Sequence, residues 1–455
     1  METTERPHTL PAEAAASTAP LVGDIEAFLS TLIAQLEPEP AAHRGPGRPR
    51  ILPALGLWAG LLVCVLRGFT SQLALWRLLT SGNLWYFPRF SLSDQAVYNR
   101  LVREGTAPLE TLFHQVRTVL AHRLAGLAIP PLAPFATELM ALDETTLDQV
   151  ARTLPALRDV PAGDARLVPG KLAGLFDIRR QQWRSVQFLP AAQQNEKVAA
   201  RGLVETLAKG ALILADLGYF GFAWFDWLTD HGYFWVSRLR AKTSYRVVHC
   251  FYQDGTTFDG IVWLGAYRAD RAAHAVRLVR FAVGTTVYHY VTNVTDPHSL
   301  SLRAIAELYA RRWDFELAVL LVKEHLKLHL LWSAKPVVIQ QQIWAVLIIA
   351  QVLQALRLEI AHRAGVDPFE VSLPLLVEYL PRFAAAGRDP IAVFVEQGRA
   401  LRFIRPSSRT QIRAPTIPAD ALALLPPNIV LVRTPRYAQR NCGKRPSKKP
   451  SKEAH

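Results

Sequence analysis

The stretch ELMALDETTL (residues 138–147) is an apolar run that ends in acidic residues and threonines. Such a run is typical of a buried strand, with Asp143 where that strand would end. KLAGLFDIRR (171–180) and WRSVQFLPA (183–191) predict two further strands, NEKVAARGLVETLAK (195–209) predicts a helix, and ALILADLGYF (211–220) predicts a strand followed by a turn. Strands that alternate with helices predict an α/β layer structure.

Residues 240–297 differ, because YRVVHCFYQ, GIVWLGAYRA, AVRLVRFAV and TTVYHYVTNV are β-rich and no helical segment separates them. They predict an antiparallel insertion in the α/β region. Helices are predicted over 52–67, 71–80 and 92–103, the last capped by Ser91 or Ser93, and again from Leu302 to about residue 400. The polar helix 92–103 is compatible with a helix-turn-helix reading head, a pattern that many non-binding helical domains share.

The composition limits the kinds of molecule that this chain is expected to bind. The chain has 455 residues, half of them apolar, and a formal net charge of +14, which favours a polyanion such as nucleic acid. An anionic membrane surface would also attract this charge, so charge alone does not decide. The cysteines, Cys64, Cys250 and Cys442, form no CxxC pair, which argues against a disulfide framework or a cysteine zinc site and favours a reducing, intracellular setting.

The sequence predicts neither a secretory signal nor a membrane span. The first twenty residues are acidic and contain proline, unlike a secretory signal. Residues 51–66 are apolar but too short for a span and interrupted by Pro53 and glycines, so they predict a buried helix. The apolar segment 336–356, which contains Gln340, Gln341 and Gln342, is also predicted to be buried.

Two basic segments flank the predicted domains. In HRGPGRPR (43–50), Gly47-Arg48-Pro49 resembles the core of an AT-hook, in which Arg48 and Arg50 would lie in an A·T minor groove. A plain basic linker is an equally good interpretation. Residues 433–455 carry eight Lys or Arg against one acid and lack apolar periodicity, which predicts a disordered tail.

These features divide the chain into consecutive segments. In order they are an acidic N-terminal helical segment (1–43), a basic linker (44–50), a helical domain expected to bind DNA (51–135), a first part of the α/β core (136–239), a β-rich insertion (240–297), a second part of the core (298–360), a C-terminal helical region (361–432) and the basic tail (433–455).

Two aspartates follow apolar runs in the core. Asp143 follows one in MALDETT, and Asp216 follows another in ILADLGYF, where Gly218 permits a sharp turn. Carboxylates at the ends of neighbouring strands lie where α/β proteins usually place their active sites. For either aspartate alone, a helix cap or a turn residue is the simpler interpretation.

The segment YARRWDFELAVLLVK (309–323) predicts a helix with one polar stripe. At 100° per residue, Tyr309, Arg312, Glu316 and Lys323 share an arc of about 60°. Glu316 could complete a carboxylate trio with the two aspartates, able to hold two divalent ions, while the other three grip phosphate oxygens. The alternative is an exposed stripe with a local Glu316–Arg312 ion pair. The neighbouring leucines favour a functional stripe, because a charged stripe on a buried face is costly without a ligand.

The spacing Y-x2-R-x3-E-x6-K, with Trp313 after the arginine, resembles the signature of DDE transposases of the insertion-sequence-four family. TNVTDPHSLSLRAIAELYARRW (292–313), LADLGYFGFAWFDWLTDHGYFWVSRLR (214–240) and ALDETTLD (141–148) resemble the corresponding segments of such enzymes. The resemblance covers about residues 136–335, in the family's order.

The resemblance implies an α/β fold with a ribonuclease-H-like mixed sheet, a β-rich insertion and flanking helical regions. It implies that Asp143, Asp216 and Glu316 are catalytic and bind Mg²⁺, with Mn²⁺ as a substitute. Tyr309, Arg312 and Lys323 would then contact DNA phosphates. There are two departures from the family pattern: Glu144 or Asp148 could take a ligand's place, and Leu320 and Leu321 stand where relatives often carry polar residues.

The implied reaction is metal-dependent nicking at the element end, followed by attack of the freed 3′-OH on target DNA. The implied partners are double-stranded DNA with terminal inverted repeats and target DNA, bound by a homodimer in the cytoplasm, at the nucleoid, without a membrane. If a hairpin forms, Tyr288, Tyr290 or Trp313 could stack on a flipped base, although a core or strand-pair role is the simpler interpretation for each. Two alternatives stay open: a catalytically silent DNA-binding protein derived from a transposase, and a ribonuclease-H-like nuclease without strand transfer.

Overall fold

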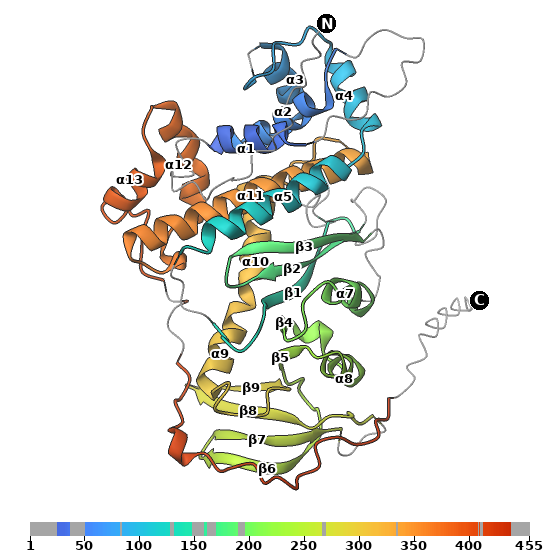
Figure 1. The fold of residues 1–455 in the computed structure, drawn as a ribbon, viewed down its shortest axis with the longest axis vertical. Helices are drawn as coiled ribbons and strands as arrows, with labels where there is room; N and C mark the ends of the chain where they lie inside the picture. The colour runs from blue at the N-terminus through green and yellow to red at the C-terminus, as the bar shows by residue number, and fades with distance from the viewer. Residues whose placement is uncertain are drawn as a thin grey trace, which may run out of the picture. The chain divides into compact units, whose positions relative to one another are not determined.

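The computed structural model describes residues 25–36, 51–81, 84–127, 132–147, 159–161, 170–189, 196–265, 270–333, 335–407, 409 and 413–437. The chain forms two compact units (Figure 1). The first comprises Met1–Asp216 and Ala306–Arg413, and the second comprises Leu217–Ile305 and Ala414–His455. The predicted core, 136–239, is therefore divided at Asp216, and its last part belongs with the β-rich insertion.

The first unit contains the mixed sheet. Its strands are β1 (Leu139–Thr146), β2 (Lys171–Asp177), β3 (Gln182–Leu189) and β4 (Leu212–Ala215), in the order β3-β2-β1-β4. The first three strands pair antiparallel, and β4 pairs parallel to β1. Helix α7 (Glu196–Val204) connects β3 to β4 and packs on β2 and β3. The prediction of an α/β fold with a mixed sheet is confirmed.

The prediction that the first strand ends at Asp143 was wrong. Strand β1 does not stop at Asp143 but continues to Thr146, because β2 still pairs with it there: Asp143 lies opposite Gly174, and Thr146 opposite Lys171. The parallel pairing with β4 ends earlier, at Leu142 opposite Ala215. Asp143 therefore lies one residue beyond the β4 contact.

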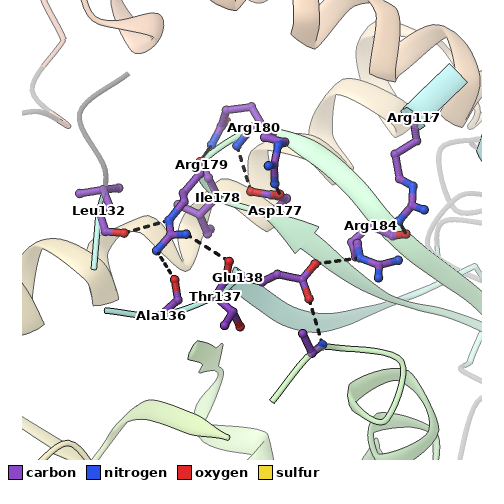
Figure 2. A network of polar contacts seen from close by, with 12 residues as sticks. Arg117, Leu132, Ala136, Thr137, Glu138, Asp177, Ile178, Arg179, Arg180 and Arg184 are labelled. Carbon is purple, nitrogen blue, oxygen red and sulfur yellow. Dashed lines mark hydrogen bonds and ion pairs between the residues drawn. The ribbon is translucent and has the colours of Figure 1, made fainter. Parts of the chain in front are cut away.

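A network of arginines holds the chain at the start of β1 (Figure 2). Arg179, in the β2–β3 turn, donates hydrogen bonds to the carbonyl oxygens of Leu132 and Ala136, both at 2.9 Å. Glu138, just before β1, accepts a hydrogen bond from Arg184 Nε of β3 at 3.1 Å. The strand that carries Asp143 is thus anchored at its entry by its sheet neighbours.

Outside this sheet, the described part of the first unit is mainly helical. Its α-helices besides α7 are α1 (Ile25–Ala34), α2 (Ala54–Leu66), α3 (Gln72–Ser81), α4 (Asp94–Arg103), α5 (Ala107–Leu124), α9 (Leu302–Arg311, of which the part from Ala306 belongs here), α10 (Trp313–Leu320), α11 (Pro336–Ala364), α12 (Leu373–Ala385) and α13 (Pro390–Gln397). The predicted N-terminal helices are confirmed, and Ser93, rather than Ser91, caps α4 through the Ala96 N–H.

Two apolar helices form the centre of this unit. Helix α2 is buried along nearly its whole length, as predicted for residues 51–66. Helix α11, which runs beside α5 (Figure 1), is long and apolar enough to cross a membrane, but 89% of its most apolar window is buried inside the protein. Its buried Gln341 donates hydrogen bonds to the carbonyl oxygens of Leu101 and Glu104, so α11 also fixes the end of α4.

In its described residues, the second unit is an antiparallel sheet with the α-helix α8 and the first residues of α9. Its elements are α8 (Phe222–Asp230), β5 (Phe234–Arg238), β6 (Tyr245–Asp254), β7 (Thr257–Leu264), β8 (Val276–Val283) and β9 (Thr286–Thr292), with the strands in the order β5-β9-β8-β7-β6. The predicted antiparallel insertion is confirmed. Inside it, Arg277 and Asp259 form a fully buried ion pair at 2.5 Å.

The end of the described chain differs from its prediction. Residues 413–437 contain no α-helix, because five prolines interrupt them, and they extend along the second unit instead. Leucines of this segment pack on the cluster of Phe251, Ile261 and Trp263. Arg433 N donates to Ala273 O at 2.8 Å, so residues 433–437 are not part of a disordered tail. Residues 438–455 lie outside the described part of the chain.

Candidate active site

The candidate site is centred on Arg312, at the break between α9 and α10. Its NH1 atom donates to Asp143 Oδ2 at 3.1 Å, and its NH2 atom donates to Glu316 Oε1 at 2.8 Å. Its Nε atom lies 3.9 Å from Asp216 Oδ1. One guanidinium thus contacts carboxylates from strand β1, from the end of β4 and from helix α10. All of these residues belong to the first unit.

These three carboxylates, Asp143, Asp216 and Glu316, are called the acidic trio below. Burial is the main reason why the pKa of Asp143 is raised to about 7, and the negative charges of Asp216 and Glu316 raise it further against the opposing effect of Arg312. Burial by itself would lower the pKa of Arg312, but its hydrogen bond to Glu316 and the acidic groups around it raise that pKa overall. The trio is therefore a concentration of negative charge that one arginine partly neutralises.

The trio is open on one side. The Asp143 side chain is 18% exposed, whereas those of Glu316 and Asp216 are 36% and 47% exposed. Water, ions or a substrate can thus reach two of the three acids directly, while Asp143 forms the floor.

The sequence predicted one continuous helix over residues 309–323, but in the structure this helix is interrupted. Helix α9 ends at Arg311, α10 begins at Trp313, and a π-helical turn follows over Leu321–His325. In that turn the Leu326 N–H donates to Leu321 O at 2.9 Å. Single π-turns inside helices often occur at functional sites, because they change the direction of the side chains that follow.

Lys323 lies in this π-helical turn. Its Nζ atom donates to Thr145 Oγ1 at 2.7 Å and to Thr146 O at 3.1 Å. Asp143 and Thr145 are two residues apart in β1, so their side chains point to the same face of the sheet. Lys323 is therefore held on the face of β1 that carries Asp143. Thr145 was not predicted, and its only local signal was this spacing from Asp143.

The two aromatic residues of the signature differ in exposure. Tyr309 is buried at 7% exposure. Trp313 is half exposed, and the Arg312 guanidinium lies 5.7 Å from the centre of its ring. In the second unit, Tyr288 and Tyr290 lie on β9, where their rings stack at 6.2 Å. Of these aromatic residues, Trp313 is thus the one that is half exposed and directly follows Arg312 in the chain.

Glu144, the alternative ligand, is directed elsewhere. It forms a buried ion pair with Lys171 of β2, and alternation along β1 directs it away from Asp143. Asp148 lies outside the described residues, as do Arg48 and Arg50 in the basic linker. Leu321 is buried in the core, whereas Leu320 is 45% exposed.

The donor set of the trio suits a hard divalent cation, because carboxylate oxygens are the ligands that Mg²⁺ prefers. Bound positive charge would also relieve the repulsion that raises the pKa of Asp143. Among the described residues, no group of three or more His, Cys, Asp or Glu is arranged as a ready metal site. In the trio, the Arg312 guanidinium contacts all three carboxylates that would hold a metal ion.

Sequence reasoning missed a second polar cluster on α10. Asp314 is 1% exposed, and its carboxylate accepts hydrogen bonds from Gln181, Arg311 and Arg409. An aspartate in the middle of an otherwise apolar helix face was the available signal. Its partners are too distant in sequence to be inferred.

The chain resembles transposases in three comparisons. Residues 166–352 match the sequence family described as transposase DDE domain, a range that includes Asp216 and Glu316 and begins after Asp143. A 101-residue segment is 29% identical to the transposase for insertion sequence element IS231F of Bacillus thuringiensis subsp. israelensis. That alignment covers 22% of this chain and 21% of the relative, about a fifth of each.

Among solved structures, a piggyBac transposase synaptic complex with hairpin DNA is similar over 80% of this chain and 77% of that one, with 10% identity and a TM-score of 0.36. The family match covers the chain from before β2 to within α11. Residues 166–352 of this protein therefore match a transposase DDE domain, and about a fifth of the chain is similar to part of an insertion sequence transposase.

Proposed function

We propose that this protein is a metal-dependent DNA transposase of the insertion-sequence-four family. It would cleave transposon ends by phosphodiester hydrolysis and transfer the resulting 3′-OH to target DNA. The observation that carries the proposal is the convergence of Asp143, Asp216 and Glu316, from three different elements, on the guanidinium of Arg312. An acidic trio of this kind matches the chemistry that two divalent ions need.

Asp143, Asp216 and Glu316 are the residues that would hold Mg²⁺, with Mn²⁺ as a substitute. When bound, such ions lower the pKa of a water molecule and stabilise the departing oxygen. The chain's own contribution is to position these carboxylates. Asp143 is fixed by the pairing of β1 with β2, and Glu316 by its place on α10, which packs on β1.

The cationic and aromatic residues would hold the DNA. Arg312 would exchange its carboxylate partners for phosphate oxygens, which its planar fork fits in a bidentate way. Lys323, fixed against β1 by Thr145, would add a point charge, with the hydroxyl of Tyr309 beside Arg312. Trp313, half exposed next to the trio, offers a surface on which an unpaired base could stack.

The partners follow from the proposed reaction. They are double-stranded DNA with terminal inverted repeats and target DNA, bound by a homodimer that holds both ends. The net charge of +14 supports a polyanionic partner. The protein would then act in the cytoplasm, at the nucleoid, where such DNA lies.

One observation favours a second candidate, a catalytically silent DNA-binding protein. Arg312 already neutralises part of the trio's charge through two hydrogen bonds, so the trio can persist without a metal. A ribonuclease-H-like nuclease without strand transfer would share the trio and differ only in its products.

A nicking assay on a duplex that carries the element's end, with Mg²⁺, tests the proposal. We expect Asp143→Ala, Asp216→Ala and Glu316→Ala each to reduce nicking by on the order of 10³-fold or more, because the metal would lose a ligand. Glu378→Ala, which removes a half-exposed surface carboxylate from the same unit, is the matched control and should nick normally. Nicking that survives all three alanine variants would refute the metal assignment.

Joining of the 3′ end to a target distinguishes the remaining alternatives. A transposase forms joined products, a nuclease stops after nicking, and a silent protein binds the same duplex without cutting it.

A further inference from the structure

Helix α10 carries a second polar cluster, on the side away from Glu316. Asp314 Oδ2 accepts hydrogen bonds from Gln181 Nε2 at 2.8 Å and from Arg311 Nε at 2.7 Å. Its Oδ1 atom accepts one from Arg409 NH2 at 3.0 Å. Asp314 and Glu316 are two residues apart, which is about 200° around the helix, so this cluster faces away from the acidic trio.

Three arginines of this cluster surround one aromatic ring. The guanidinium carbons of Arg311, Arg357 and Arg409 lie 4.6, 5.0 and 4.5 Å from the centre of the Phe369 ring. We call Arg311, Arg357 and Arg409 the arginine cluster. They come from the end of α9, from α11 and from the segment after α13, so the fold brings them together from three separate places.

Positive charge exceeds negative charge there. Asp314 neutralises one of the three guanidiniums, and Asp367 lies near enough to affect the pKa values of Arg357 and Arg409. Contact with the Phe369 ring compensates a further part of the charge. Unmatched charge in a buried place is unfavourable unless a partner neutralises it.

Part of the hydrogen-bonding capacity is also unused. Arg357 is 4% exposed, and its NH2 atom donates to Gln181 Oε1 at 2.7 Å. Within the described residues, Arg357 Nε and Arg409 NH1 are buried and have no hydrogen-bond partner. Burial lowers the pKa of Arg357 to about 10, so it still carries its charge at neutral pH.

The cluster has an accessible rim and a buried floor. The side chains of Arg311 and Arg409 are 22% and 25% exposed, whereas Arg357 is buried beneath them. Guanidinium groups around one point are the arrangement that recognises tetrahedral oxyanions, because each planar fork can donate two parallel hydrogen bonds.

We propose that the arginine cluster binds a phosphate group of the DNA backbone, at a contact separate from the acidic trio. The proposal rests on the proposed function for the identity of the ligand. The bound phosphate would supply the missing negative charge, and it would anchor a strand on the opposite side of the helix that carries Glu316.

The first test measures binding to a duplex that lacks any element end, without divalent metal, as salt is raised. Each phosphate contact contributes about 0.9 to the slope of log affinity against log salt. We expect Arg311→Gln and Arg409→Gln each to reduce the magnitude of that slope by about one. Arg409→Lys, which keeps the charge, should keep the slope. Arg382→Gln, which removes an exposed arginine from the same unit, should leave the slope unchanged.

The second test uses inorganic phosphate and the unaltered protein, so it does not depend on a variant that folds. Phosphate should raise the melting temperature relative to chloride at equal ionic strength, because it binds only the folded state. The increase should be lost in Arg409→Gln and kept in Arg382→Gln. No increase in the unaltered protein would overturn the anion site.

The outcomes separate this proposal from the proposed function. Folded glutamine variants with unchanged salt slopes overturn the DNA contact, even if phosphate stabilises the protein, because the cluster then holds only a free anion. Changed slopes in a protein that never nicks would support the contact and refute the catalysis. Normal nicking with unchanged slopes would refute the contact alone.

Discussion

The two sides of helix α10 carry opposite arrangements of charge. On one side, the single guanidinium of Arg312 lies among three carboxylates. On the other, the single carboxylate of Asp314 lies near three guanidiniums, two of which donate to it. Arg312 is thus the central cation of one cluster, and Asp314, two residues later, is the central anion of the other. A helix between two such clusters can present cation-binding and anion-binding groups from one rigid element.

The two clusters differ in burial, and this difference separates their tasks. The trio is exposed through Asp216 and Glu316, whereas Asp314 is inaccessible and accepts hydrogen bonds from three other parts of the chain. Exposed, repelling charges are suited to binding a ligand, and a buried, fully bonded charge is suited to holding a helix in place. The buried Gln181, which has a φ of 53°, shows the same constraint, since its side chain connects Asp314 to Arg357.

The largest expected effect comes from removing the central charge of the buried cluster. Asp314→Ala should lower the free energy of unfolding by about 3–5 kcal/mol, because it leaves Arg311 and Arg409 without their carboxylate partner and the buried Arg357 without the negative charge beside it. Urea unfolding measures the change. Asp216→Ala is the control on the exposed side and should change stability by less than about 0.5 kcal/mol. Equal effects at the two positions would remove the distinction drawn between the clusters.

A smaller effect is expected from removing the central charge of the trio. Arg312→Gln leaves the three carboxylates facing one another, so the metal-free protein should lose about 1–3 kcal/mol of stability. Mg²⁺ should restore this loss, and it should raise the melting temperature of Arg312→Gln more than that of the unaltered protein. The control is Arg382→Gln, whose response to Mg²⁺ should match that of the unaltered protein. A variant that does not respond to Mg²⁺ would count against a metal site at the trio.

The smallest effect on stability is expected at Trp313, which lies between Arg312 and Asp314 in the sequence. Because it is half exposed, Trp313→Ala should change the free energy of unfolding by less than about 0.5 kcal/mol. Affinity for DNA with an unpaired base at the element end should fall by about 1–3 kcal/mol, the usual contribution of one stacked base. Fluorescence anisotropy measures both DNA forms, and a fully paired duplex is the control. An equal loss on both forms would exclude base stacking.

Most of the fold could be predicted, because its elements are encoded by local patterns. Apolar runs predicted β1, β2, β3 and β4, and the absence of helical periodicity predicted the antiparallel insertion. The failures have specific causes. Strand β1 continues past Asp143 because its pairing with β2 continues, and residues 413–437 extend along the second unit because their leucines find a cluster there.

The identities and spacing of the signature residues can be read directly from the chain, since they lie within fifteen consecutive positions. Their arrangement cannot, because it depends on the parallel pairing of β1 with β4, on the break at Arg312 and on the π-helical turn before Lys323. The arginine cluster is the arrangement that is hardest to predict from the sequence. Its members lie far apart in sequence, and an aspartate in a helix looks the same in sequence whether it faces water or buried arginines. Short-range propensities shape each segment, but only folding determines which distant charges meet.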